Sequence, residues 1–431
     1  MHIRNGKKNK DIIMQFLVLF GMEFDIPHIG FVSLRKIVFA ILLFYCLRSK
    51  KMQGNIQKNM VLAVGAVSLL FVYGWFVFGI RFGEYEQIPV EAYNIKTPII
   101  LMLDMIIFPV LIIRIFNSAE EFIRCQWRVT LLQSAIVFIG RLIRPVRMFI
   151  FENFAYGDGR LEEGVYTGVR SVGINLAGAA GSVVLFAGLI CGIYLFYQTR
   201  DRKKKNNIII GFMLIIAANL FMGRTGLYFS VIALGIVFMD AICKFDRSAL
   251  WLVTGSIIIL AGCLIYVFLA PNTWGLRTWI RWVTEIGDLF GKERTISAIL
   301  NMNIPPLTME TLLGTGLYSG MTKTGVPFSH DAGYIRTYTS IGLIGGVLYY
   351  GSIYGFYLLM INKVKSRKKK RIYLFFLLAI VIAEMKEPFL AKTPLTIIMS
   401  CMLILETSTS RHFIYNEEAI CERNKQKQSI S

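Results

Sequence analysis

The sequence contains few acidic residues, few histidines and none of the common metal or nucleotide motifs. Its 431 residues include 27 Asp and Glu against 47 Lys and Arg, and only 4 His. No C-x-x-C pair is present, which argues against a zinc site. Neither a D-x-D motif nor a P-loop occurs, so nucleotide-sugar and ATP chemistry are not indicated. We therefore expect a protein that uses no metal and no other cofactor.

Apolar residues, in contrast, are abundant. They make up 55% of the chain, and the mean hydropathy of +0.56 is well above that of soluble globular domains. Several apolar segments reach about 20 residues, long enough to cross a hydrocarbon core of roughly 30 Å. The first apolar run follows a basic N-region, but no small-residue cleavage site comes after it. The sequence predicts an all-α fold, a polytopic integral membrane helix bundle that forms a single domain over residues 1–431.

The apolar pattern predicts about twelve transmembrane helices (11–12). The expected spans are 11–22, 29–47, 60–80, 98–116, 127–144, 178–198, 208–222, 225–243, 249–270, 337–361, 372–387 and 393–408. Arg35 and Lys36 lie inside the second of these spans. One of the first two segments is therefore a candidate for a re-entrant helix, which enters the membrane without crossing it.

The lysine-rich segments predict the orientation of the chain. With the N-terminus inside, all of them fall on the inner side of the membrane, as the positive-inside rule requires. The clusters are Lys7-Lys8-Lys10, Lys50-Lys51, Arg202-Lys203-Lys204-Lys205 and Arg367-Lys368-Lys369-Lys370-Arg371. We therefore expect cytoplasmic N- and C-termini, and we attribute the net charge of +20 to topology rather than to nucleic-acid binding. None of the seven cysteines lies in an expected external segment, so no disulfide framework is predicted.

Two expected external segments are long, residues 145–177 and 271–336, and long ordered loops commonly carry function. The second begins "NTWGLRTWIRWVTEIGDLFG", in which apolar and charged residues fall on different faces of a helix. This pattern predicts an interfacial amphipathic helix with tryptophans at headgroup depth. Such a helix is either a surface anchor or the border of a lipid-facing cleft.

Arginine is the characteristic cation of the expected external segments. Arg160 and Arg170 fall in the first long loop, and Arg277 and Arg281 fall in the second. Arg224 lies in "NLFMGRTGLYFSVIAL", where one span ends and the next begins with almost no loop. A planar guanidinium binds phosphate oxygens bidentately, which a lysine point charge does less well. Two interpretations of Arg224 stay open: contact with nearby lipid phosphates, or a position facing a substrate cavity.

Further polar residues gather where expected spans reach the external side. The stretch "PFSHDAGYIRTYTSIGLIGG" places His330 and Asp331 before a span, with Tyr334 close behind them. His330 can exchange a proton at neutral pH, and Tyr334 either stacks on sugar faces or belongs to an aromatic belt. Glu384 and Lys386 close the eleventh span in "AEMKEPFLAKTP". They either pair with neighbouring charges or line a cavity that opens to the outside.

Four of these stretches give the chain a resemblance to a known family. They are "GRTG" at a span junction, "LLGTGLYSG" in the second long loop, "SHDAGYI" followed by "GLIGGVLYYG", and "EMKEPFL". Together they resemble the Wzy-type O-antigen and capsular polysaccharide polymerases, which are related to the O-antigen ligases. The resemblance is best over residues 208–390, and the preceding part matches in topology only. In ligases the histidine is commonly followed by Asn, whereas Asp331 follows it here, which favours a polymerase.

The resemblance implies a glycosyltransferase of the bacterial plasma (inner) membrane with its active site facing outside. It would join undecaprenyl-diphosphate-linked oligosaccharide repeat units into O-antigen, capsular or exopolysaccharide, without a metal. The residues that would act on the donor diphosphate are Arg224 and Arg160 or Arg170, assisted by Arg277 or Arg281. His330 would serve as the base or orient the hydroxyl, supported by Asp331.

The implied partners are the lipid bilayer, the lipid-linked oligosaccharide, a chain-length regulator and a flippase. Two alternatives stay open. A ligase-type transferase differs from a polymerase only in its acceptor. A transporter or flippase of the same lipid-linked sugars would carry charges near midspan and broken helices in paired halves. The sequence has no internal repeat, and its charges gather at one side, which favours the enzyme.

Overall fold

The structure is a computed structural model that describes ten stretches of the chain. They are residues 2–24, 34–48, 58–81, 92–154, 165–166, 170–174, 178–244, 247–269, 304–317 and 332–408. The amphipathic helix expected from Asn272 onwards lies outside the described residues.

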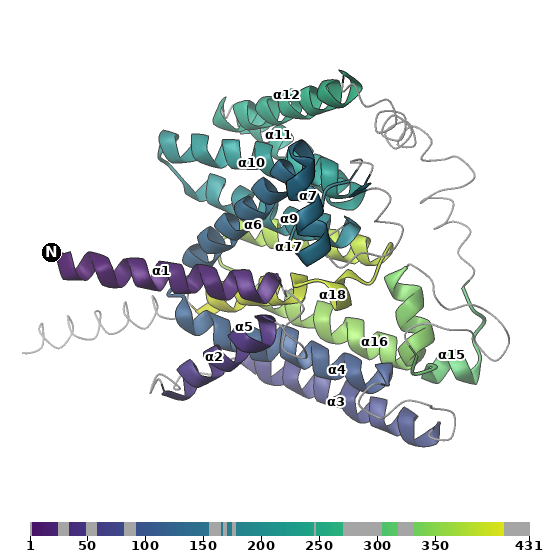
Figure 1. Ribbon diagram of the computed structural model, residues 1–431. Coiled ribbons are helices and arrows are strands. Elements are labelled where there is room, and N and C mark those ends of the chain that lie inside the picture. The colour runs from purple at the N-terminus through teal and green to yellow at the C-terminus, as the bar shows by residue number, and fades with distance from the viewer. Residues whose placement is uncertain are drawn as a thin grey trace, which may run out of the picture.

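The described stretches are almost entirely helical (Figure 1). The elements are α1 (His2–Glu23), α2 (Leu34–Arg48), α3 (Lys58–Ile80), α4 (Tyr93–Met102), a π-helical turn (Leu103–Ile107), α5 (Phe108–Ile112), a 3₁₀ turn (Ile113–Ile115), α6 (Ala119–Leu142), α7 (Arg144–Phe154), α9 (Gly178–Gln198), α10 (Arg202–Met222), α11 (Arg224–Lys244), α12 (Arg247–Leu269), α15 (Met309–Leu313), α16 (Gly333–Asn362), α17 (Arg367–Glu384), α18 (Phe389–Lys392) and a final helix, Leu395–Ser408. No β-strand occurs in these stretches, so the predicted all-α class is confirmed.

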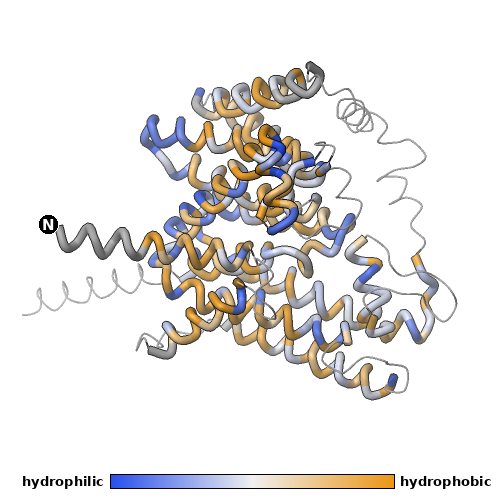
Figure 2. The backbone as a smooth tube through the Cα atoms, viewed as in Figure 1, coloured by the Kyte–Doolittle hydropathy of each residue, from blue (hydrophilic) through white to orange (hydrophobic). Residues whose placement is uncertain are grey.

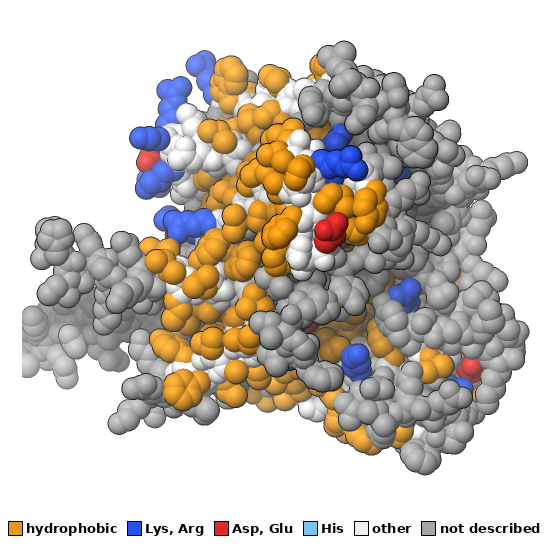
Figure 3. All heavy atoms as spheres, viewed as in Figure 1, with side chains coloured by type: hydrophobic (Ala, Val, Ile, Leu, Met, Phe, Trp, Pro, Cys, Tyr) orange, Lys and Arg blue, Asp and Glu red, His pale blue; other side chains and the backbone are white. Residues whose placement is uncertain are grey.

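Several of the helices are suited to a membrane. Among the described residues, six helical segments are long and apolar enough to cross a bilayer. They are Asn59–Ile80, Tyr93–Ile115, Gly178–Gln198, Arg202–Met222, Arg224–Lys244 and Gly333–Asn362. Their apolar middle sections form a hydrophobic zone with hydrophilic residues towards the helix ends (Figure 2), and hydrophobic side chains cover much of the described surface seen in Figure 3. Every expected span overlaps a described helix, but the total of about twelve stays a prediction.

Helix α9 lies at the centre of the bundle. It packs against α6, α10, α11 and α17, and 89% of its apolar window is buried. Small residues permit this close packing, because a Cβ on Gly188 or Gly192 would overlap the side chains of Thr130 and Trp127 on α6. Helices in a bilayer associate chiefly by such close packing, since lipid tails are as apolar as the helices themselves. The glycines of α9 therefore allow the neighbouring helices to approach closely.

Two of the lysine-rich segments lie at the same end of the bundle. Lys369 at the start of α17 forms an ion pair of 2.8 Å with Glu406 of the last helix and lies over the ring of Tyr194 on α9. Lys205 at the start of α10 lies 4.9 Å from the ring centroid of Phe196, also near the end of α9. We call this end the basic end. It agrees with the predicted topology, although its assignment to the cytoplasmic side stays a prediction.

Helix α16 is broken rather than straight. Gly342 has φ 79° and ψ 171° within it, a conformation that is essentially restricted to glycine. Tyr334 and Tyr350 would be about 24 Å apart along a straight helix, yet their ring centroids are 4.7 Å apart. The Thr337 and Tyr350 hydroxyls also form a hydrogen bond of 2.9 Å. The single expected span 337–361 is therefore interrupted near one end, where the chain folds back on itself.

A segment of the second long loop fills this break. The backbone N–H groups of Thr315 and Gly316 donate to the carbonyls of Thr339 and Ser340, at 2.9 and 2.8 Å. Within a continuous helix, those carbonyls would accept bonds from the following turn. Gly314 has φ 92° and ψ 155°, and a Cβ there would lie 2.4 Å from the carbonyl carbon of Ile341. The glycines of "LLGTG" and "GLIGG" thus permit direct backbone contact between α15 and α16.

The first long loop also differs from its expected form. Residues Arg144–Phe154 form a helix, α7, with Arg147, Ile150 and Phe151 buried. Its apolar face packs beside Val165 and Val172 of the same expected loop. A helix of this length is too short to cross a bilayer, so the expected loop 145–177 begins with a short helix that packs against α6.

Candidate functional site

Three segments far apart in the sequence meet at the end of the bundle opposite the basic end. The Lys386 ammonium donates to the Thr225 hydroxyl at 2.8 Å, which joins the α17–α18 connection to the start of α11. The Ser171 N–H donates to the carbonyl of Phe221 at 3.0 Å, which joins the first long loop to the end of α10. We call the charged residues brought together here the cation cluster: Arg170, Arg224, Lys386 and Glu387.

The turn that holds Arg224 is very tight. Helix α10 ends at Met222, Gly223 is extended with φ −173° and ψ 147°, and α11 begins at the next residue. A Cβ on Gly223 would lie 2.5 Å from the carbonyl oxygen of Gly178, so the turn is pressed against the start of α9. The Gly226 N–H donates to the hydroxyl of Ser182 on α9 at 3.0 Å. Arg224 therefore begins a helix whose first turn is fixed in place.

Arg170 is linked to the cluster by electrostatics as well as by its loop. Burial is the largest cause that lowers the pKa of Arg170, and the positive charge of Arg224 lowers it further. The carboxylate of Glu387 acts in the opposite direction and raises it. Arg170 and Arg224 are each half-buried. Arg170 and Arg224 together carry more positive charge than the carboxylate of Glu387 offsets, and such an excess suits an anionic ligand.

Three more arginines, which are not among the site residues predicted from the sequence, lie near this end. Arg141 lies 5.4 Å from the ring centroid of Phe221, next to the α10–α11 turn. Arg147 is buried and donates to the carbonyl of Gly140 at 3.4 Å, while burial first, and then the charges of Arg141 and Arg144, lower its pKa. Their regular spacing of three in the sequence was the available signal, although Arg141 lies near the end of α6 and the other two lie on α7.

Glu384 is placed inside the bundle rather than in an open cavity. It is 1% exposed, and its two carboxylate oxygens accept hydrogen bonds from the Tyr350 hydroxyl at 3.0 Å and the Leu390 N–H at 3.1 Å. A Cβ on Gly333 would lie 2.7 Å from its carboxylate, so the start of α16 packs directly on it. Glu384 thus connects "AGYI" to "EMKEPFL" and positions Lys386 two residues further on.

Tyr334 also points into the protein. Its hydroxyl is 3.0 Å from the hydroxyl of Tyr354 and donates to the carbonyl of Val381 at 3.0 Å. These bonds hold the first arm of α16 against its second arm and against α17. The Tyr334 hydroxyl therefore takes part in helix packing.

The other predicted site residues lie outside the described residues. They are Arg160, Arg277, Arg281, His330 and Asp331. The nearest described residue to the last two is Ala332, which is 2% exposed and directly precedes α16. His330 and Asp331 thus come immediately before the segment that packs on Glu384.

Two contacts of the site could not be read from the sequence. Thr225 binds Lys386 through its hydroxyl, and Ser182 binds the N–H of Gly226. Threonine and serine are common in membrane helices, so their types alone gave no signal. Only the position of Thr225, directly after Arg224 in "GRTG", pointed to this end of the span.

The described residues contain no group of three or more His, Cys, Asp or Glu that could hold a metal ion. No protein-family model, curated protein or solved structure matches this chain.

A separate polar feature lies within the bundle. Asp104 is 6% exposed and stands in the π-helical turn, as the twelfth of the 23 residues of Tyr93–Ile115. Glu23 at the end of α1 is 4% exposed. Arg35 at the start of α2 interacts electrostatically with both carboxylates and donates to the carbonyl of Met22 at 3.0 Å. Ionisable groups at such depth are functional candidates, and π-helical turns often mark functional sites.

Proposed function

We propose that this protein is a membrane glycosyltransferase that polymerises oligosaccharide repeat units carried on a lipid diphosphate. The observation that carries the proposal is the cation cluster, where Arg170, Arg224 and Lys386 meet at the end of the bundle away from the basic end. With Glu387 as the acidic member, the cluster has three cations and one carboxylate. Its position at a helix end suits a ligand whose diphosphate lies between an apolar tail and soluble sugars.

The cluster would bind the diphosphate of the donor. Arg224 and Arg170 would contact the phosphate oxygens, and Lys386, held by Thr225, would contribute a third positive charge. As the glycosidic C–O bond breaks, the diphosphate gains negative charge, which nearby cations stabilise. The three cations would therefore stabilise the departing lipid diphosphate without a metal ion. Arg160, Arg277 and Arg281 stay candidates for further contacts with the donor.

The reaction transfers the growing chain to a new repeat unit. A hydroxyl of the acceptor repeat attacks the anomeric carbon of the donor sugar and forms the new C–O bond. The bond from that carbon to the diphosphate breaks, and the lipid diphosphate leaves with the electron pair. His330, supported by Asp331, would accept the proton that the hydroxyl loses. Both residues precede the arm of α16 that packs on Glu384, which lies two residues before Lys386.

The proposal places the protein in the bacterial plasma membrane, with the cation cluster outside and both termini in the cytoplasm. The lysine-rich basic end supports this orientation. The product would be O-antigen, capsular polysaccharide or exopolysaccharide, built from undecaprenyl-diphosphate-linked repeats. A flippase would supply these repeats, and a chain-length regulator would act beside the polymerase.

Substitution of Arg224 tests the proposal. In null cells complemented with the variant, we expect Arg224→Lys to shorten the surface polysaccharide nearly as much as Arg224→Ala, because lysine cannot make bidentate contacts. Arg202→Ala is the matched control, because it removes an exposed arginine at the basic end and should leave chain lengths unchanged. The measurement is a gel of surface polysaccharide, with protein amounts checked by immunoblot. Wild-type chain lengths from a well-expressed Arg224→Ala protein would remove this arginine from the proposed site.

The same gel separates a polymerase from a ligase. Loss of a polymerase leaves acceptors that carry a single repeat, because transfer to the final acceptor continues. Loss of a ligase instead leaves long polymer on the lipid carrier and none on the final acceptor. Asp331 stands where ligases commonly have Asn, which supports a polymerase and therefore acceptors that carry a single repeat.

The buried acid Asp104 favours a second candidate, a transporter of lipid-linked sugars. Transporters place ionisable groups near midspan, and Asp104 lies at the middle of its span beside the charge of Arg35. The discriminating measurement is the membrane face on which single lipid-linked repeats accumulate in null cells. Repeats on the outer face support the polymerase, and repeats retained on the cytoplasmic face support the transporter.

A further inference from the structure

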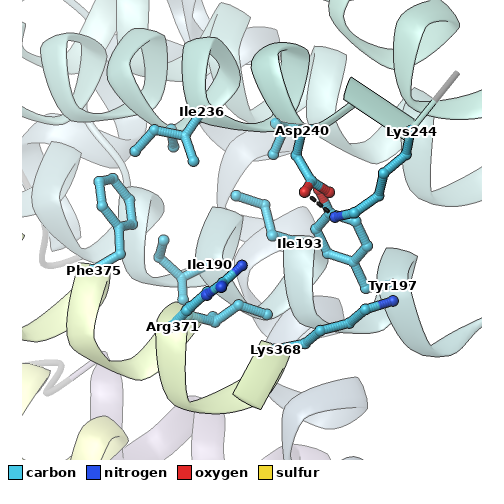
Figure 4. A pocket seen from close by; sticks show the side chains of 12 residues that line it. Ile190, Ile193, Tyr197, Ile236, Asp240, Lys244, Lys368, Arg371 and Phe375 are labelled. Carbon is cyan, nitrogen blue, oxygen red and sulfur yellow. Dashed lines mark hydrogen bonds and ion pairs between the residues drawn. The ribbon is translucent and has the colours of Figure 1, made fainter. Parts of the chain in front are cut away.

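A cavity with apolar walls lies at the basic end, between α9, α11 and α17 (Figure 4). Its volume is about 160 Å³. Its apolar walls include Ile190, Ile193, Ala233, Ile236, Val237 and Phe375. Apolar cavities of about 150 Å³ can hold a guest the size of benzene. This one therefore has room for part of a hydrocarbon chain.

Charged side chains surround the same cavity. Lys244, Lys368, Arg371 and Asp240 line it together with the apolar residues. Figure 4 shows Arg371 and Lys368 extending from α17, opposite Lys244 and Asp240 on α11. Three cations and one carboxylate leave a local excess of two positive charges. A ligand for this place combines an apolar chain with an anionic group.

The carboxylate among these lining residues, that of Asp240, already has two partners. Asp240 accepts a hydrogen bond of 2.9 Å from the Tyr197 hydroxyl through one oxygen and pairs with Lys244 through the other. Within the described part of the chain, no ion pair joins Lys368 or Arg371 to a carboxylate. Their charges are therefore available to an anion from outside the protein.

The spacing of the basic run in α17 explains this arrangement. Lys368, Arg371, Ile372 and Phe375 follow one another at intervals of three, one and three, so they share one face of the helix and line the cavity. Lys369 lies on another face, where it pairs with Glu406 at 2.8 Å. Within the run "RKKKR", Lys369 therefore links α17 to the helix Leu395–Ser408, while Lys368 and Arg371 face the cavity.

We propose that this cavity binds an anionic phospholipid of the adjacent leaflet. One acyl chain enters between α9 and α11, and the headgroup phosphate lies against Arg371 and Lys368, with Lys244 nearby. Basic pockets between membrane helices on the cytoplasmic side are suited to anionic headgroups. Arg371 can bind the phosphate bidentately, while Lys368 provides a mobile point charge. This site is independent of the cation cluster, which lies at the opposite end of the bundle.

The test compares lipids that differ only in their headgroup. Purified protein in detergent is titrated with phosphatidylglycerol or with phosphatidylcholine of the same acyl chains, and binding is followed by native mass spectrometry. We expect phosphatidylglycerol to bind more tightly to the wild type. The Lys368→Gln/Arg371→Gln variant should bind it about 25-fold more weakly, since each cation near the surface contributes about a fivefold factor. Both side chains are exposed, so this variant should fold.

Two further variants define the site. Arg202→Gln/Lys203→Gln removes the same charge from the start of α10, away from the cavity, and should leave phosphatidylglycerol binding within about twofold of wild type. Ala233→Leu extends a larger side chain from the apolar wall into the cavity. It should weaken phosphatidylglycerol binding although the three cations remain. Equal binding of the two lipids by the wild type would overturn the proposal. Equal phosphatidylglycerol binding by Lys368→Gln/Arg371→Gln and the wild type would also overturn it.

Discussion

Replacement of Gly226 by alanine should destabilise the protein, because α9 and α11 are in direct backbone contact there. A Cβ at this position would lie 2.0 Å from the carbonyl oxygen of Ser182 and 2.3 Å from its carbonyl carbon. These are backbone atoms, so relief requires the two helices to separate. Overpacking of this kind costs about 1–3 kcal/mol. Loss of the bond from the Gly226 N–H to the Ser182 hydroxyl would add about 1 kcal/mol.

A second glycine of the same helix provides the control. A Cβ on Gly235 would meet no atom within 4 Å, and this residue is exposed. Gly235→Ala should therefore be neutral, or stabilising by up to about 1 kcal/mol, since alanine favours the helix. The assay is unfolding by SDS in mixed micelles, followed by tryptophan fluorescence. The two variants make the same chemical change in one helix, so their difference isolates the contact with α9.

The same variant also reports on the candidate site. Gly226 follows Arg224 and Thr225 directly, so a displaced α11 should also disturb the contact between Thr225 and Lys386. We expect Gly226→Ala to shorten the polysaccharide as well as to lower stability. If Gly226→Ala and Gly235→Ala unfold at the same SDS concentration, the close approach of α9 and α11 is wrong. The position of Arg224 at the start of α11 would then be wrong as well.

Two further predictions concern the broken helix and the orientation. Gly342→Ala should destabilise the protein by about 1–3 kcal/mol, because only glycine readily adopts its backbone conformation. Gly351 lies in open space on the same helix, so Gly351→Ala should have no such effect in the same SDS assay. If the two variants unfold at the same SDS concentration, the break in α16 is wrong. Reporter fusions after Lys204 and Lys369 should report the cytoplasm, and a fusion at Asn303 should report the outside. A cytoplasmic reporter at Asn303 would place the proposed active site on the wrong face of the membrane.

The continuous apolar segments were the most predictable part of the fold. The expected span 178–198 coincides with α9, and 60–80 nearly coincides with α3, because uninterrupted apolar runs have few other stable structures in a bilayer. The break in α16 was not predicted, since an isolated glycine in a helical pattern is often tolerated. Gly342 differs because the backbone of Gly314, in the long loop that precedes α16, lies against it.

The residue types of the candidate site were easier to predict than their contacts. Arg224 and Lys386 were found because charges at the ends of apolar spans are conspicuous. Glu384 was found for the same reason, but its two hydrogen bonds inside the bundle depend on how α16 and α18 pack. The bond from Lys386 to Thr225 joins residues that are 161 positions apart. Local pattern carries no information about such a pairing.

The ion pair between Lys369 and Glu406 has a consequence for biogenesis. Lys369 belongs to a basic run of the kind that orients helices during membrane insertion, whereas Glu406 is 37 residues later. The lysine is therefore synthesised before its partner, begins as a solvated charge and pairs with a carboxylate only afterwards. Until the helix Leu395–Ser408 has been inserted, the basic ends of α9 and α17 lack this connection. The helix Leu395–Ser408 thus completes the closure of the bundle at the basic end.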